Sequence, residues 1–232
     1  VVSISRKPIL NTLNHLSSNL SFPFEAFKET FAIQFANIFL TIITRIDMVI
    51  LSFFSGPLVA APYALAQKFV QPITMLGRVL SNSTSPMLTS ADAGGKNKNI
   101  NFIISLSFIF VALGSIFIIL FLYLMYDFII NYLSADYSLD QTTILYLIGS
   151  QLSLVISAPF AQYLLMTKKA NKVIFSNLTA CVIFFTIIIF NLDHLSALTM
   201  AKYSFVATLS MAIMSIYLSL KALSINYESI NS

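Results

Sequence analysis

Six long apolar blocks limit what this chain can fold into more than any other feature of its sequence. Each is long enough to cross about 30 Å of hydrocarbon as a helix, which needs about 20 residues. Polar stretches that carry Gly, Pro, Asn and Ser separate the blocks and favour chain reversals. The blocks cover residues 26–54, 60–85, 100–126, 142–166, 171–191 and 196–221. The sequence therefore predicts an all-α fold, a polytopic membrane bundle of six transmembrane helices.

The composition is that of a membrane protein. Hydrophobic residues make up 57% of the 232 residues and charged residues only 9%, whereas about 25% of a soluble domain is charged. The net charge of +4 does not imply nucleic acid, because most basic residues fall in short loops between apolar blocks. The single cysteine, Cys181, excludes an internal disulfide and a cysteine-ligated metal site, and we expect no cofactor.

Short polar segments flank the six blocks. Residues 1–25, VVSISRKPILNTLNHLSSNLSFPFE, are basic and rich in Ser and Asn, which is typical of a cytoplasmic connector. They lack the apolar core and cleavage site of a signal peptide, and the chain does not begin with Met. We therefore expect further residues upstream, a transmembrane lobe at 26–221 and a cytoplasmic tail at 222–232.

Lysine and arginine gather on one predicted side of the bundle. The basic residues of that side are Arg6, Lys7, Lys28, Lys96, Lys98, Lys168, Lys169, Lys172 and Lys221. The loops on the other side carry only acidic charges, at Asp127, Asp136, Asp140 and Asp193. Because basic loops remain in the cytoplasm, we expect both termini on the cytoplasmic side of the membrane.

Two charges interrupt the first apolar block, in the stretch TRIDMVILSFFSG. Arg45 or Asp47 would each cost about 2.5 to 3.5 kcal/mol if it faced lipid at the centre of a helix. On a helix the two point roughly 160° apart, so they do not pair with each other. Arg45 instead shares an arc of about 100° with other polar residues. These are Gln34, Asn37, Thr41, Thr44 and Ser52.

The second block carries a stronger polar stripe. Its members recur at spacings of three and four within an arc of about 80°, and they are Lys68, Gln71, Met75, Arg78 and Asn82. Pro72 removes a backbone hydrogen bond and favours a kink. The fourth block has a milder stripe, which we interpret as a helix-packing seam; it consists of Thr143, Tyr146, Ser150, Ser153 and Ser157. The third block is apolar all round, so we expect it to face lipid.

Intramembrane cations favour a water-filled cavity, with a buried structural ion-pair network as the alternative. A cavity that holds Arg45, Lys68 and Arg78 favours an anionic ligand, because the guanidinium fork suits phosphate or carboxylate oxygens. Neighbouring amides could bind the hydroxyl groups of a sugar. The candidate substrate-binding residues are Arg45, Lys68, Arg78, Gln34, Asn37, Gln71 and Asn82.

The run from Thr44 to Ser90 resembles the helix-pair signature of polysaccharide flippases of the O-antigen type, in the multidrug/oligosaccharidyl-lipid/polysaccharide superfamily. Aliphatic residues follow the Arg45 and Asp47 pair, and a Ser-Gly turn comes next. The turn consists of Ser55 and Gly56, and the remaining matching residues are Tyr63, Ala64, Pro72 and Pro86. Six spans with cytoplasmic ends extend the resemblance over nearly the whole chain.

The resemblance implies a lobe of a larger transporter. Such flippases have two similar six-helix lobes around a cationic cavity, and they move an isoprenoid-diphosphate-linked oligosaccharide across the inner membrane by alternating access. The chain would be one lobe, with lipid-linked oligosaccharide, membrane lipids and a second six-helix lobe as partners. Arg45 and Arg78 would meet the diphosphate with help from Lys68. Asp47 would be a structural counter-ion or a coupling-ion site.

Other classes of function remain alternatives. A drug or cation antiporter of the same superfamily would be expected to hold carboxylates in its cavity, whereas these stripes are cationic. A structural or assembly subunit could complete the cavity of another chain. An enzyme is not expected, because the chain offers only His15 and His194, the latter beside Asp193, and no catalytic constellation.

Overall fold

Helices make up nearly all of the described chain. The computed structural model describes residues 24–93, 97–133 and 140–231, and these contain no β-strand. Most of the expected connector and parts of two loops, with Lys96 and Asp136, lie outside the described residues. The helices are α2 (Phe24–Ser55), α3 (Pro57–Ala93), α4 (Asn97–Leu133), α5 (Gln141–Met166), α6 (Ala170–Ile189), the 3₁₀ turn η1 (Leu192–His194) and α7 (Ala197–Asn231). The predicted all-α polytopic membrane bundle is confirmed.

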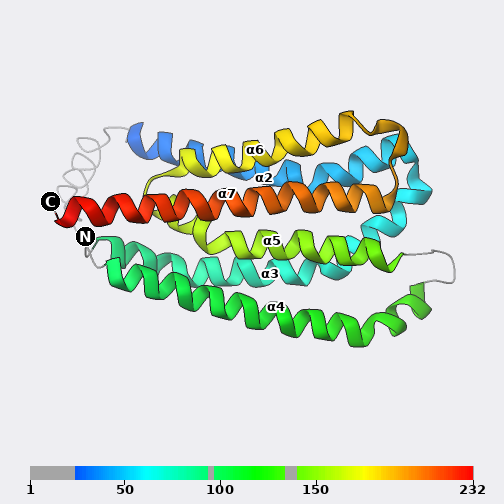
Figure 1. Cartoon of the computed structure of the whole chain (residues 1–232), viewed down its shortest axis with the longest axis horizontal. Helices are drawn as coiled ribbons and strands as arrows, with labels where there is room; N and C mark the ends of the chain where they lie inside the picture. The colour runs from blue at the N-terminus through cyan, green and yellow to red at the C-terminus, as the bar shows by residue number, and fades with distance from the viewer. Residues whose placement is uncertain (1–23, 94–96, 134–139, 232) are drawn as a thin grey trace, which may run out of the picture.

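Five helices of the described part are long and apolar enough to cross a membrane. The spans are Phe27–Ser55, Phe102–Phe121, Gln141–Met166, Ala170–Ile189 and Ala197–Leu223. The remaining long helix, α3, is not among them, because polar and charged residues interrupt its apolar sequence. It nevertheless lies alongside α5 and α4 in the bundle (Figure 1). The six predicted blocks therefore all form helices, but apolarity alone identifies only five spans.

Tight turns connect several of the helices. Gly56 joins α2 to α3 with φ at +84°, a left-handed conformation that a side chain would strain. Pro57 then begins α3, where its missing N–H costs nothing. The Ser55 hydroxyl donates to the Leu195 carbonyl oxygen at 2.8 Å, which fixes this turn against the start of α7.

The ends of two helices, the start of α5 and the end of α7, are defined by the structure more closely than by the sequence. Asp140 caps α5 by accepting bonds from the backbone N–H and the hydroxyl of Thr142. These bonds, and the charge of Lys202, lower the pKa of the Asp140 carboxyl below its ordinary value. At the other end of the chain, α7 continues to Asn231, so the expected tail at 222–232 begins inside a helix.

The helices form two groups joined by α7. On one side α2 packs against α6, and on the other α3 packs against α5 and α4 (Figure 1). Helix α7 contacts both α5 and α6. A cluster of buried apolar side chains includes contributions from all six long helices, such as Leu51, Tyr63, Val111, Leu147, Phe184 and Met200.

Helix α4 lies at the edge of the bundle. Four of its buried residues recur at every fourth position, on the side where α4 packs against α3 and α5; they are Ile103, Ser107, Val111 and Ser115. Its outer face is apolar, with Phe110, Leu113 and Phe117 exposed by 56%, 62% and 70%. This distribution agrees with the expectation that the third block faces lipid.

Small polar residues line the contact between α5 and α7. Thr208 donates to the Ser150 hydroxyl at 3.2 Å, and Ser150 lies 3.4 Å from the hydroxyl of Ser204. A similar pair, Ser176 and Ser215, joins α6 to α7 at 2.8 Å. At Ser150 the structure agrees with the predicted packing seam on the fourth block, because small hydroxyl side chains let membrane helices approach closely. Ser157 of the same stripe instead lines the cavity.

Candidate functional site

A cavity of about 840 Å³ lies between α2 on one side and α3 and α5 on the other. Helices α6 and α7 add a few residues, and α4 contributes none among those described. Its polar lining residues are Asn37, Thr41, Thr44, Arg45, Gln67, Lys68, Gln71, Thr74, Arg78, Asn82, Gln151, Ser157, Gln162, Asn177 and Ser215. The two polar stripes seen in the sequence therefore form facing walls of one site.

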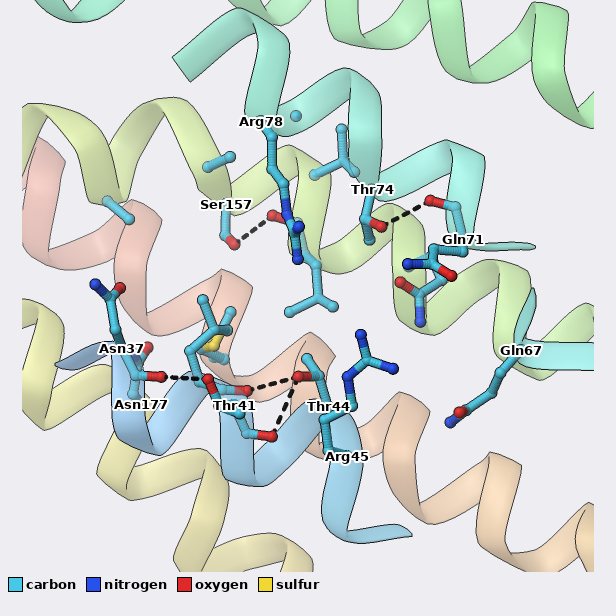
Figure 2. A pocket seen from close by; sticks show the side chains of 18 of the residues that line it. Asn37, Thr41, Thr44, Arg45, Gln67, Gln71, Thr74, Arg78, Ser157 and Asn177 are labelled. Atoms are coloured by element: carbon cyan, nitrogen blue, oxygen red, sulfur yellow. Dashed lines mark hydrogen bonds between the residues drawn. The ribbon is translucent and has the colours of Figure 1, made fainter. Parts of the chain in front are cut away.

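The three cations of the stripes share this cavity. Arg45 from α2 and Arg78 from α3 extend into the same space from facing walls (Figure 2), and Lys68 also lines it. Within the described ranges none of the three forms an ion pair at contact distance, although the charge of Arg45 also acts on Asp47. Among the described lining residues there is no Asp or Glu. The described residues therefore favour the cavity over the alternative of a buried ion-pair network.

An ion pair between two described residues lies at one end of the bundle. Lys168, in the turn between α5 and α6, lies 3.1 Å from Glu29 near the start of α2. Both side chains are largely exposed, so this surface pair contributes little to stability. It does show that the α5–α6 turn and the beginning of α2 share one end of the bundle.

Gln34 is the one candidate binding residue that the structure leaves outside the cavity. It is exposed on α2 beside the aromatic ladder of Phe31 and Phe35. The reason is rotational: Gln34 lies about 60° around the helix from Asn37, toward the outer surface. Arg45 lies on the same outer side of the stripe, but its longer side chain reaches the cavity. The other neutral candidates, Asn37, Gln71 and Asn82, all line it.

Asp47 lies outside the cavity lining and is only 1% exposed. The Tyr63 hydroxyl and the Gln67 amide nitrogen, both from α3, donate to Oδ2 at 2.7 and 2.6 Å. The backbone N–H of Met48 donates to Oδ1 at 2.7 Å. The direct partners of Asp47 are therefore neutral donors, and the carboxyl group joins α2 to α3.

Four hydroxyl groups of the cavity lining donate to carbonyl oxygens of their own helices. Thr41 donates to the Asn37 carbonyl oxygen and Thr74 to that of Gln71, each at 2.8 Å (Figure 2). In the same way, Thr44 donates to Leu40 O at 2.9 Å and Ser157 to Leu154 O at 2.8 Å. Each of these hydroxyl groups donates its hydrogen bond within its own helix, which leaves the lone pairs of its oxygen available to a ligand.

Sequence reasoning missed the residues that reach the cavity from outside the two stripes. Asn177 of α6 is buried and donates to the Ala36 carbonyl oxygen at 2.9 Å, which fixes α6 against α2. Gln162 of α5 donates to the Ser85 hydroxyl at 3.1 Å and ties α5 to α3. Gln67 lies at the edge of the α3 stripe. The signal that could have indicated Asn177 is an amide side chain inside a predicted membrane span.

Comparison with known proteins adds a family match. A family model described as MatE matches residues 32–184. These residues include α3, α4 and α5, most of α2 and α6, and all three cavity cations. No curated protein and no solved structure matches the chain.

Proposed function

Because the chain belongs to the MatE family, whose members are transporters rather than enzymes, we propose that its cationic cavity binds the diphosphate of an isoprenoid-diphosphate-linked oligosaccharide. The family lies within the multidrug/oligosaccharidyl-lipid/polysaccharide superfamily, and it supports a multi-pass membrane transporter. The proposed activity is that of one lobe of a flippase, which moves this lipid-linked substrate across the membrane by alternating access.

The observation that carries the proposal is the position of Arg45 and Arg78 on facing walls of one cavity, whose described lining holds no carboxylate. Two guanidinium groups in such a lining favour a doubly charged anion between them. Lys68 adds a third positive charge on the α3 wall. The volume of about 840 Å³ falls within the range of small-molecule sites, which suits a diphosphate with its first sugars.

A second lobe would cover the open side of the cavity. If that side faced lipid, each cation near the helix centre would cost about 2.5 to 3.5 kcal/mol. We therefore propose a second six-helix lobe as partner, either elsewhere in a longer protein or in another chain. A purely structural or assembly role would share this arrangement but would show no ligand binding.

The distribution of charged residues supports the proposed orientation. Lys28 near the start of α2, Lys168 in the α5–α6 turn and Lys221 near the end of α7 belong to the basic end of the bundle. By the positive-inside rule, that end lies in the cytoplasm of a bacterial inner membrane, with both termini there.

A drug or cation antiporter is the second candidate function, and Asp47 is the observation that favours it. Asp47 is a carboxylic acid buried within a membrane helix, and its partner Gln67 lines the cavity. Such a group is a possible site for a proton or a cation. The cavity itself, however, has a cationic lining that repels cationic drugs.

Two probes of opposite charge separate these functions. The full chain in lipid nanodiscs would be titrated with farnesyl diphosphate and with tetraphenylphosphonium. The flippase proposal expects the diphosphate to bind, and Arg45→Ala or Arg78→Ala to weaken it by about 1.5 to 3 kcal/mol each. Lys202→Ala is the matched control, because Lys202 lies outside the cavity, 5.5 Å over the Tyr146 ring. Binding of the cation but not the diphosphate would favour the antiporter.

A further inference from the structure

We propose that Gln67 is a specificity-determining acceptor for ligand hydroxyl groups, and that Asp47 is the positioning residue that orients it. The inference deepens the proposed function and rests on it: the cations bind the anionic part of the substrate, and Gln67 recognises its sugar. The ligand class is thus a hydroxylated head group attached to a diphosphate.

The first step is the contact between Gln67 and Asp47. The amide nitrogen Nε2 of Gln67 lies 2.6 Å from Asp47 Oδ2. The same oxygen accepts from the Tyr63 hydroxyl at 2.7 Å, and Oδ1 accepts from the Met48 N–H at 2.7 Å. Three donors therefore converge on one buried carboxyl group and hold it in place.

The second step is the direction of the amide. In the structure Gln67 presents its NH₂ group to Asp47 Oδ2, which is the arrangement that a carboxylate, able only to accept hydrogen bonds, requires. Its carbonyl oxygen Oε1 then points away from Asp47. No hydrogen bond to this oxygen is recorded among residues 24–93, 97–133 and 140–231, and the Gln67 side chain lines the cavity (Figure 2). A glutamine that could rotate freely would offer either end, whereas this one offers an acceptor.

The third step is the surrounding cavity wall. The hydroxyl groups of Thr44 and Thr74 donate to their own helices and present lone pairs, as Gln67 does. Arg45 and Arg78 present only donors. The site thus separates acceptors for ligand hydroxyls from donors for ligand phosphate. A phosphate group that has lost its protons cannot satisfy an acceptor, so Gln67 gains nothing from the diphosphate itself.

Two probes that differ only in the sugar test this role. The full chain in nanodiscs would be titrated with farnesyl diphosphate and with farnesyl diphosphate that carries one N-acetylglucosamine. We expect wild type to prefer the sugar-bearing probe by about two- to tenfold, the worth of one net hydrogen bond. Gln67→Met should abolish this preference, because it weakens the sugar-bearing probe more than farnesyl diphosphate. Asp47→Asn should reduce the preference, because an asparagine can hold either end of the Gln67 amide.

Gln34→Met is the matched control, because Gln34 lies on α2 outside the cavity lining; it should leave both dissociation constants unchanged. Equal losses for both probes in Gln67→Met and Asp47→Asn would show a purely structural contact and overturn the inference. A ligand-side test needs no variant: single deoxy forms of the sugar should include one that binds wild type two- to tenfold more weakly. If no deoxy form differs, the inference is wrong.

The outcomes also separate this inference from the function on which it rests. Wild type that binds both probes equally would overturn the role of Gln67 and leave the diphosphate site intact. Wild type that binds neither probe would overturn the proposed function and the inference with it.

Discussion

Asp47 on α2 and Tyr63 on α3 are joined by a hydrogen bond of 2.7 Å that is buried inside the bundle. The two residues lie on either side of the Gly56 turn, so the bond closes the hairpin formed by the two helices that carry the cavity cations. It fixes how α2 and α3 are rotated against each other. The facing positions of Arg45 and Arg78 depend on that rotation.

The first prediction concerns this bond. Asp47→Asn should lower the free energy of unfolding by about 1 to 3 kcal/mol, because the new NH₂ group leaves at least one buried donor without an acceptor. Tyr63→Phe should cost less, about 1 kcal/mol, because it removes a single donor and leaves Gln67 and Met48 in place. Thermal unfolding in detergent measures both. Wild-type stability of Asp47→Asn would show that the carboxyl group has no structural role.

The second prediction concerns transport. Arg45→Ala and Arg78→Ala should leave the protein inserted in the membrane but reduce export of surface polysaccharide, because each removes a charged contact to the substrate. Arg45→Lys should restore only part of the loss, since an ammonium lacks the guanidinium fork. The measurement is complementation of polysaccharide export, beside quantified membrane levels of each variant. Normal export by the double alanine variant at wild-type abundance would contradict a cationic substrate site.

The third prediction concerns close helix packing. A Cβ atom at Gly149 would lie 2.8 Å from the ring of Phe205, so Gly149→Ala should destabilise the α5–α7 contact by about 1 to 3 kcal/mol. The Phe205 ring also packs against Tyr146, with centroids 6.0 Å apart, which limits its movement. Phe205→Leu in the Gly149→Ala background should recover part of the loss. Additive losses in the double variant would argue against this steric cause.

The fourth prediction concerns orientation. In a Cys181→Ala background, single cysteines would be placed at Asn171 and His194, which are exposed residues at opposite ends of α6. The positive-inside rule predicts that an impermeant thiol reagent labels His194→Cys in intact cells and labels Asn171→Cys only after the cells are opened. The reverse pattern would invert the proposed topology.

Periodicity within single helices allowed much of the site to be predicted. Lys68, Gln71, Arg78 and Asn82 were expected on one face of a helix, and all four line the cavity. The α-helix has a fixed rotation per residue, so residues of one helix keep their relative directions whatever packs around them. For the same reason Asp47 was correctly separated from the Arg45 face.

What the sequence alone determined was therefore the class of fold and the composition of each helix face. Long apolar blocks must form helices in a bilayer, and the polar faces follow from the helical repeat. Tertiary packing decided which faces meet: it brought Asn177 from a distant helix to the cavity, left Gln34 outside it, and gave Asp47 its partners on α3. Those outcomes depend on how each helix is rotated against its neighbours, which side-chain packing between helices sets and no single segment encodes.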